Sequence, residues 1–421
     1  MFIMSNLIIY KNKNTNTVVL SLVFKVGSIN ENSKNSGLTN LCEHLFFRHL
    51  NSSNMLKNRL NNIGASLEAT TYHEFVRFYI SVLPQFTVEA AEILYDILRC
   101  EDWTEDDLCE EKNVIRNKLQ NSSVSYDEFV DRFYFGNNKY SRPILGDIET
   151  LDQLTILQAN SYKNKYFTDD NCCLIITGGI FNRHENQIRE MFSFLQNSGE
   201  VKNDSLIRPK NLFCRTEKDI RYIKCPYYDS DVQISFDVNN QTVPLHKLIL
   251  LNEIIGASAF SRLPYELVTK QPLTDSIYSE CNLYNSFSRI KITYSVNCHN
   301  LPDSFEEISA ILLNQITEDE LRSAKYAVQR KFYSMVDSNE EYNFNIGWHN
   351  FVHGNDYSVN GFIENVDLVN IQDMVVAFRE VFKPDNISGV IYYNSDIISR
   401  KELSETANAF RKSCFNAPLI I

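Results

Sequence analysis

The sequence predicts an α+β protein that is built from two similar halves. The order of its strand and helix candidates repeats after roughly 210 residues, which fits a duplicated domain. The strand candidates are rich in valine, isoleucine and other β-favouring residues. A polar segment that carries Pro209 and Pro226 separates the two halves. We therefore expect domains at 1–200 and 230–421, joined by a connector at 201–229.

The first half begins with a strand candidate that is dominated by β-branched and aliphatic residues. Amphipathic helix patterns follow, in which apolar residues recur every three or four positions. Pro84 marks the break between the strands and the helices that follow them. In chain order, we expect a strand at 17–27, helices at 37–50 and 55–63, strands at 65–71 and 74–82, helices at 85–100 and 105–120, a strand at 172–177 and a helix from 182.

The second half repeats this order of elements. We expect a strand at 231–238, helices at 245–256 and 257–269, strands at 275–281 and 288–296, helices at 303–315 and 318–336, and a closing strand at 387–393. A repeat of this length is far too long for a solenoid, so it favours two domains of one kind.

The bulk properties exclude several classes of protein. A chain of 421 residues can form two or three domains with proper cores. The net charge of −12 argues against a nucleic-acid binder, which would carry a basic face. Ten cysteines without a C-x-x-C pair predict reduced thiols rather than a disulfide framework. Neither a signal peptide nor an apolar run long enough to span a membrane is recognisable, so we expect a cytoplasmic protein.

The most informative motif is Asn-Leu-Cys-Glu-His at 40–44. Residues i and i+4 of a helix share one face, where two histidines can hold Zn²⁺. The inverted zinc motif of metallopeptidases is H-x-x-E-H, and its glutamate activates the metal-bound water. Glu43 and His44 match that motif, but Asn40 stands where the first histidine belongs.

The run at 37–45 resembles the zinc helix of the M16 metallopeptidases, which include insulin-degrading enzyme, pitrilysin and mitochondrial processing peptidase. In that family a later helix carries E-x6-E: its first Glu lies behind the metal ligands, and its second is the third ligand. Glu111 and Lys118 stand at these two positions. The resemblance covers nearly the whole chain. It implies two M16-type domains, each a mostly antiparallel sheet flanked by helices, which form half of a clam-shell chamber.

Of the three zinc ligands that the resemblance implies, only His44 remains, because Asn40 and Lys118 replace the other two. A catalytic zinc site needs three protein ligands. We therefore expect Glu43 and Glu111 to be vestigial and this chain to bind no metal. Residues seven apart share a helix face, so Lys118 is expected to form an ion pair with Glu43 or Glu111.

The second functional feature of the family is an Arg, with a Tyr seven residues later, that contacts the substrate. Arg262-Leu263 matches the start of that region, and Tyr278 matches the tyrosine. Val268 falls where the arginine is expected, and Lys270 is the nearest cation that could substitute for it. The resemblance thus makes Arg262, Lys270 and Tyr278 candidates for substrate binding.

These features predict a non-catalytic subunit that pairs with a catalytic M16 partner, in which the zinc would lie. The pair would enclose an extended peptide, which can bind by adding a strand to a sheet edge. The abundance of Asn, Ile, Lys and Tyr indicates an AT-rich bacterial genome. By analogy we expect a role in processing leader peptides or bacteriocin precursors. Two alternatives stay open: an active zinc endopeptidase with a variant ligand set, and a stand-alone peptide-binding scaffold.

Overall fold

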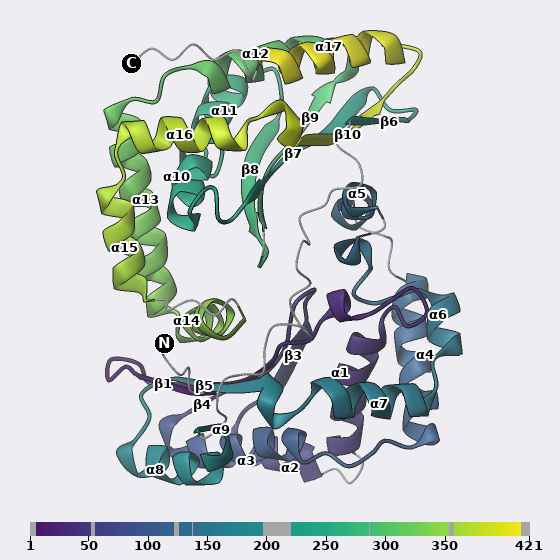
Figure 1. Ribbon diagram of the computed structural model, residues 1–421, viewed down its shortest axis with the longest axis vertical. Coiled ribbons are helices and arrows are strands. Elements are labelled where there is room, and N and C mark those ends of the chain that lie inside the picture. The colour runs from purple at the N-terminus through teal and green to yellow at the C-terminus, as the bar shows by residue number, and fades with distance from the viewer. Residues whose placement is uncertain are drawn as a thin grey trace. The chain divides into compact units, whose positions relative to one another are not determined.

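The computed structural model describes residues 6–51, 55–121, 126–136, 138–196, 220–285, 287–352 and 358–413. These residues form two compact units (Figure 1). The first unit comprises the described residues up to 196 together with 333–352, and the second comprises the rest. The predicted α+β class is confirmed in both units.

The first unit contains a five-stranded sheet in the order β1-β5-β2-β4-β3. Its elements are β1 (Leu7–Lys11), β2 (Val18–Phe24), η1 (Ser28–Asn30), α1 (Leu38–Asn51), α2 (Met55–Ile63), β3 (Leu67–Thr71), β4 (Val76–Val82), η2 (Pro84–Phe86), α3 (Thr87–Leu98), α4 (Glu105–Asn121), α5 (Tyr126–Phe135), η3 (Lys139–Ser141), α6 (Ile148–Gln153), α7 (Ile156–Tyr166), η4 (Asp169–Asn171), β5 (Cys172–Gly178), α8 (Asn182–Met191), α9 (Ser193–Gln196), α14 (Asn339–Ile346) and η7 (Gly347–Val352).

The second unit contains a five-stranded sheet in the order β6-β10-β7-β9-β8. Its elements are β6 (Ile220–Lys224), β7 (Asp229–Asn239), α10 (Leu245–Ile255), α11 (Arg262–Pro264), η5 (Tyr265–Lys270), β8 (Ser276–Leu283), β9 (Phe287–Asn297), η6 (Cys298–Asn300), α12 (Leu301–Leu313), α13 (Glu318–Asp337), α15 (Val359–Leu368), α16 (Ile371–Val381), η8 (Pro384–Asn386), β10 (Ile387–Tyr393) and α17 (Arg400–Ser413). From Tyr333 onward, α13 belongs to the first unit.

The two sheets have the same topology, strand for strand. In each sheet one edge pair is parallel, β1 with β5 and β6 with β10, and the remaining pairs are antiparallel. The expectation of a repeated, mostly antiparallel sheet is therefore correct. The sequence did not reveal β1 or β6, because each is five residues long and mixes apolar with charged residues. β6 lies inside the segment that we expected to be a connector.

A large apolar core fills the space between one face of the first sheet and its helices. The helix α1 contributes Leu38, Leu41, Cys42, Leu45 and Phe46, all at most 2 % exposed. This is the i, i+3, i+4, i+7, i+8 spacing of one helix face. Asn40, Glu43 and His44, the polar residues of the motif, therefore lie outside this apolar stripe.

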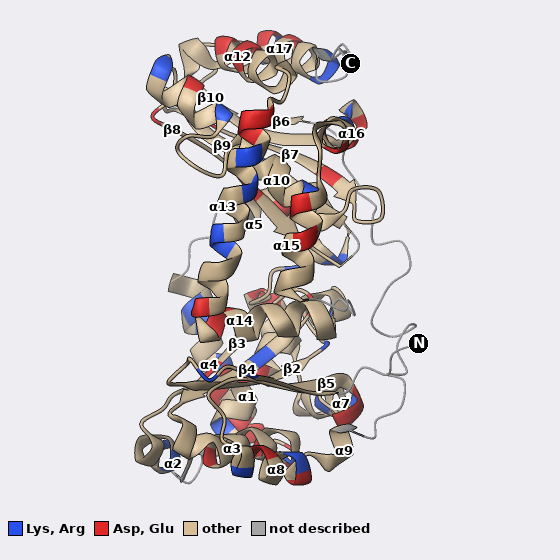
Figure 2. Ribbon diagram, turned by 90° about the vertical axis from the view of Figure 1, so that its left-hand side faces the viewer, with Lys and Arg blue, Asp and Glu red and all other residues tan. Residues whose placement is uncertain are grey.

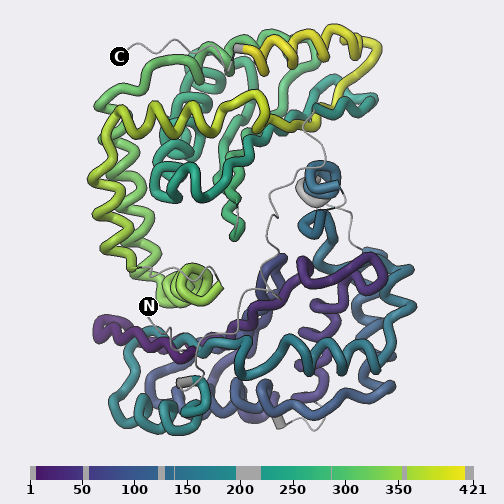
Figure 3. The backbone as a smooth tube through the Cα atoms, viewed as in Figure 1, coloured from purple at the N-terminus to yellow at the C-terminus, as the bar shows by residue number. Residues whose placement is uncertain are grey.

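The opposite face of the first sheet is covered by a segment from late in the chain. The helix α14 packs on β2 and β5, as the green tube beside the purple and teal strands in Figure 3 shows. The Asn343 side chain is fully buried and donates to the carbonyl oxygens of Val19 and Ile175, at 3.0 and 3.2 Å. The side chain of Asn339, one turn earlier, donates to the Thr17 carbonyl oxygen at 3.1 Å. The two asparagines thus tie α14 to the sheet.

The expectation of a helix at 257–269 is wrong for residues 257–261. The structure has a loop at 257–261, then the short α11 and the π-helix η5. Ser258 and Ser261 hydrogen-bond to each other in this loop. Serine side chains that compete for backbone hydrogen bonds in this way favour turns over helices.

In Figure 2, α17 carries charged residues of both signs, whereas the charged residues of α12 are all acidic. No helix in the described part of the chain is both long and apolar enough to cross a membrane.

Candidate functional site

The helices α1 and α4 cross in the first unit, and they bring the motif residues and the Glu111–Lys118 pair together. His44 is the centre of this cluster. Its Nδ1 lies 3.1 Å from Glu111 Oε2, and its Nε2 lies 3.3 Å from Lys118 Nζ. A carboxylate can only accept and an ammonium can only donate. His44 therefore carries its proton on Nδ1 and accepts from Lys118 at Nε2.

This arrangement corrects one expectation. Lys118 lies in the cluster, but among the described residues its polar contact is with His44, not an ion pair with Glu43 or Glu111. The carboxylate of Glu111 is used instead by His44 and by Arg48, whose Nη1 lies 3.5 Å from Glu111 Oε1. Arg48 also forms an ion pair with Glu110. The sequence analysis missed Arg48, although it follows His44 by one helical turn and so shares its face.

Glu43 is 8 % exposed and accepts a hydrogen bond of 2.5 Å from Thr71 Oγ1 at the end of β3. This contact joins α1 to the edge strand of the first sheet. Asn40 is 6 % exposed, and within the described residues its Oδ1 has no hydrogen-bond partner. His73, which follows β3, forms a hydrogen bond of 2.7 Å between its Nδ1 and Ser28 Oγ, and burial lowers its pKa to about 4.

The donor set does not match the pattern of a zinc protease. Catalytic zinc is held by three His, Asp, Glu or Cys ligands and keeps one open position. Here one imidazole is present, the second ligand position holds an amide, and the third holds an ammonium that lies against the imidazole Nε2. In the described part of the chain, no three His, Cys, Asp or Glu residues are grouped so that they could hold a metal ion.

The N-terminus of α1 is fixed by Glu31, which the sequence analysis missed. Its two carboxylate oxygens accept from the backbone N–H groups of Gly37 and Thr39, both at 2.8 Å. Gly37 has a φ of +84°, and an added Cβ would lie 2.7 Å from the Leu145 carbonyl oxygen. Only glycine meets both demands. Burial raises the pKa of Glu31 to about 7, although the hydrogen bonds from Thr39 and Gly37 act in the opposite direction.

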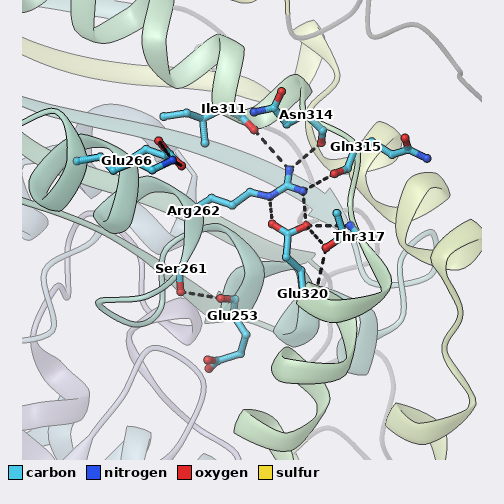
Figure 4. A network of polar contacts seen from close by, with 10 residues as sticks. Glu253, Ser261, Arg262, Glu266, Ile311, Asn314, Gln315, Thr317 and Glu320 are labelled. Atoms are coloured by element: carbon cyan, nitrogen blue, oxygen red, sulfur yellow. Dashed lines mark hydrogen bonds and ion pairs between the residues drawn. The ribbon is translucent and has the colours of Figure 1, made fainter.

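In the second unit, Arg262 is held by a dense polar network (Figure 4). Its Nε and Nη2 donate to the two oxygens of Glu320, at 2.6 and 2.7 Å. Nη1 donates to the carbonyl oxygen of Asn314 at 2.7 Å, and Nη2 to that of Gln315 at 2.8 Å. These contacts join α11 to the connection between α12 and α13. They favour a structural role for Arg262, so its contact with a substrate stays a prediction.

Glu320 serves two partners at once. It accepts from the backbone N–H of Thr317 at 2.8 Å, while its own N–H donates to Thr317 Oγ1 at 3.2 Å, which forms a capping box at the start of α13. Burial would raise the pKa of Glu320, but the hydrogen bonds from Arg262 and Thr317 outweigh it and lower the pKa. The capping box is visible in the sequence as Thr-x-x-Glu, so this signal could have been used.

The other two residues expected to bind substrate, Lys270 and Tyr278, also lie in the second unit. Lys270 ends η5, is exposed, and forms an ion pair with Glu266 at 2.9 Å, which raises the pKa of the lysine. Tyr278 lies on the edge strand β8 with 44 % of its surface exposed. Tyr278 also lines a pocket of about 360 Å³ together with residues of η5.

The comparisons with known proteins show the family of the chain. Residues 7–148 match the model of the family "Insulinase (Peptidase family M16)", and residues 153–328 match "Peptidase M16 inactive domain". An uncharacterized zinc protease of Bacillus subtilis, YmxG, is 23% identical over 90% of this chain and 94% of its own length. The β subunit of the mitochondrial-processing peptidase of Saccharomyces cerevisiae is 22% identical over 86% of this chain and 83% of its own length.

Solved structures share the fold. A protease from Helicobacter pylori superposes with a TM-score of 0.77 at 17% identity, over 93% of this chain and 98% of that one. A peptidase M16 inactive domain from Pseudomonas fluorescens gives the same TM-score at 16% identity, over 92% and 95% of the two chains.

Proposed function

Because this chain belongs to peptidase family M16, we propose that it is a non-catalytic subunit of an M16-type zinc metallopeptidase. It would complete the peptide-binding chamber of a partner subunit that carries the zinc. The yeast relative is itself described as one subunit of a peptidase, which supports an assembly of this kind.

The observation that carries the proposal is the contact between Lys118 and His44. The lysine Nζ lies 3.3 Å from His44 Nε2, so the exposed side of the imidazole already has a cationic donor. A zinc ion needs the lone pair on that nitrogen, and a neighbouring ammonium would repel the ion. In an active family member, the position of Lys118 holds a glutamate whose carboxylate is a zinc ligand. Asn40 takes the place of the other histidine ligand, so His44 is the one imidazole left in the motif.

Glu43 and Glu111 would then stabilise the structure rather than take part in catalysis. A general base must lie within reach of a water that gives up a proton. Without bound zinc, no water near Glu43 has a lowered pKa. Its carboxylate instead holds Thr71, and Glu111 holds His44 and Arg48. These contacts preserve the crossing of α1 and α4 and the position of β3.

Peptide binding does not need the metal. A peptide that adds to a sheet edge uses backbone hydrogen bonds. In the described residues, β3 and β8 are edge strands with no further strand paired on their outer side. An extended peptide is therefore the ligand that we propose. The processing of leader peptides or bacteriocin precursors stays a prediction about the pathway.

The test is the zinc content of the purified chain after dialysis, together with cleavage of unstructured peptides. We expect far less than one zinc per chain and no cleavage by the chain alone. About one zinc per chain, with cleavage that a chelator abolishes, would favour an active endopeptidase with a variant ligand set and overturn the proposal. Cleavage that appears only after an intact M16 partner is added would support it.

A further inference from the structure

A second pocket, of about 310 Å³, lies in the first unit. A volume of this size suits a small organic molecule. None of the polar residues that meet around His44 belongs to its lining. The pocket is formed by α5, by the segment that leads from η3 to α6, and by two residues from elsewhere in the unit: His73, Leu119, Asp131, Arg132, Tyr140, Ser141, Arg142, Pro143, Ile144, Leu145 and Gly146.

The wall at 140–146 is held firmly in place. At one end of this wall, the buried hydroxyl of Tyr140 donates to the carboxylate of Glu74. At the other end, Gly146 has a φ of +73°, and an added Cβ would lie 2.6 Å from the Ser36 carbonyl oxygen. Only glycine allows this close packing against the chain before α1. A pocket whose walls are already ordered binds a ligand at a lower entropic cost than a mobile one.

Arg142 brings a cationic group to the pocket. Its Nη1 donates to the backbone carbonyl oxygen of Glu31. The carboxylate of Glu31 accepts instead from the N–H groups of Gly37 and Thr39. A guanidinium has five N–H donors, so the Glu31 contact orients the group and leaves donors for a ligand. Burial lowers the pKa of Arg142, although the charge of Glu31 acts in the opposite direction.

Lys139 places a second cation close to Arg142. It begins η3, and its pKa is lowered by burial and by the charge of Arg142. Within the described residues, no carboxylate forms an ion pair with either of these cations. Asp131 and Arg132 bring one charge of each sign to the lining, so Arg142 leaves it with a net positive charge. Like charges this close favour the binding of an anion between them.

The rest of the lining offers a neutral polar group and an apolar surface. Burial lowers the pKa of His73 to about 4, so its imidazole is uncharged at neutral pH. Its Nδ1 is bonded to Ser28 Oγ, which leaves Nε2 to form a hydrogen bond with a ligand. Four residues supply apolar contacts: Leu119, Pro143, Ile144 and Leu145.

We propose that this pocket binds a small organic anion, whose carboxylate or phosphate group is held by Arg142 and Lys139. Hydrogen bonds between ionised partners are stronger than neutral ones, and a guanidinium matches the geometry of both anionic groups. The apolar body of the ligand would lie against Leu119 and Ile144. This inference goes beyond the proposed function, because it needs neither zinc nor a partner subunit.

The probes are phenyl phosphate, benzoate, benzyl alcohol and inorganic phosphate, and isothermal titration calorimetry on the full chain measures their binding. We expect both aromatic anions to bind, more weakly as the salt concentration rises, and the neutral alcohol not to bind measurably. Inorganic phosphate should bind at least about tenfold more weakly than phenyl phosphate, because it buries no ring. Tighter binding of phenyl phosphate than of benzoate would identify a phosphorylated ligand, and the reverse order a carboxylic acid.

Three variants locate the binding. Arg142→Met should weaken the binding of the tighter aromatic anion about tenfold or more, because charged hydrogen bonds are lost. Lys139→Met should weaken it about threefold. Lys57→Met, which removes an exposed lysine of α2, is the matched control and should leave the binding unchanged.

Three outcomes would overturn the inference: no binding of either aromatic anion, equal binding of benzyl alcohol, or binding that Lys139→Met and Arg142→Met leave as strong as Lys57→Met does. Circular dichroism checks that each variant is folded. If Arg142→Met does not fold, Arg142→Lys takes its place, because it keeps the charge but loses the planar fork and should still weaken binding. The zinc measurement tests the proposed subunit role independently of these titrations.

Discussion

Two helix starts, one in each half, are capped by a glutamate, and the pKa values of the two glutamates shift in opposite directions. Glu31 caps α1 and Glu320 caps the start of α13, and each accepts hydrogen bonds from backbone N–H groups. Burial raises the pKa of Glu31 to about 7, whereas Glu320 has a lowered pKa because Arg262 donates to both of its oxygens. Glu31 is buried, and its hydrogen bonds do not offset the desolvation, whereas Glu320 is only partly buried, and the donors of Arg262 and Thr317 outweigh its desolvation.

The two candidate regions also differ in where their polar side chains gather. Around His44, in the first half, polar side chains from α1 and α4 meet in one cluster: His44, Arg48, Glu111 and Lys118. In the second half, α10 carries mostly apolar residues, and the polar contacts gather around Arg262. The same fold thus places its polar clusters differently in the two halves: between α1 and α4 in the first, and around α11 and the start of α13 in the second.

Restoring the lost ligands tests the first region and should give the largest effect. In Asn40→His/Lys118→Glu, α1 and α4 would present His, His and Glu around one point, as a zinc protease requires. We expect about one zinc per chain in elemental analysis, against almost none for the unchanged chain. Asn40→His alone should stay low, because Lys118 still contacts His44. Failure of the double variant to take up zinc, while it remains folded, would show that α1 and α4 no longer have the layout of a metal site.

Removing the guanidinium tests the second region. Arg262→Met leaves Glu320 and several carbonyl oxygens without their donors, so we expect a loss of about 3 to 5 kcal/mol in the free energy of unfolding. Urea unfolding measures it. The matched control is Arg322→Met, because the pair of Arg322 with Asp319 is 60% and 81% exposed and should cost less than about 1 kcal/mol. Equal losses in the free energy of unfolding for the two variants would contradict a structural role of Arg262.

The two caps should respond to pH in opposite directions. The pKa of Glu31 is raised in the folded state. Its contribution to the free energy of unfolding is therefore present below the unfolded pKa of about 4.3 and is lost as the pH rises through about 7. Relative to Glu31→Gln, the unchanged chain should lose roughly 2 to 3 kcal/mol between pH 5 and pH 8. The free energy of unfolding at the two pH values checks this.

Glu320 provides the counterpart to that experiment. The pKa of Glu320 is lowered in the folded state. Its contribution to the free energy of unfolding is therefore present above the pKa of the unfolded state and is lost as the pH falls through the pKa of the folded state. Relative to Glu320→Gln, the unchanged chain should weaken as the pH falls below about 4. Parallel pH profiles for the two Gln variants would contradict the comparison.

The smallest effect is expected at Glu43. Glu43→Gln keeps a side-chain oxygen that can accept from Thr71, so the loss in stability should be about 1 kcal/mol or less. The peptidase activity of a complex with an intact partner should stay nearly unchanged, as measured by cleavage of a peptide substrate. A fall of about 100-fold or more, the usual scale of general-base catalysis, would mean that Glu43 still acts on a water.

Local patterns in the sequence predicted much of the fold. The long strands β2, β7 and β9 and the helices α1, α4 and α13 carry strong periodicity, so their places could be read along the chain. The edge strands β1 and β6 could not, because a short parallel strand is defined by the partner it pairs with. The packing of α14 on the first sheet was equally hidden, since Asn343 and Ile175 are 168 residues apart.

The sequence by itself determined the chemistry that is present: Asn40, Glu43 and His44 on one helix, and Glu111 and Lys118 seven apart on another. Helical spacing is local, so these residues could be assigned to common faces without a structure. Only the tertiary structure decided which partner each side chain takes. Lys118 contacts His44 rather than a carboxylate, and Arg262 is bound by Glu320 and carbonyl oxygens. Such pairings depend on the distance between elements and on burial, which no local pattern encodes.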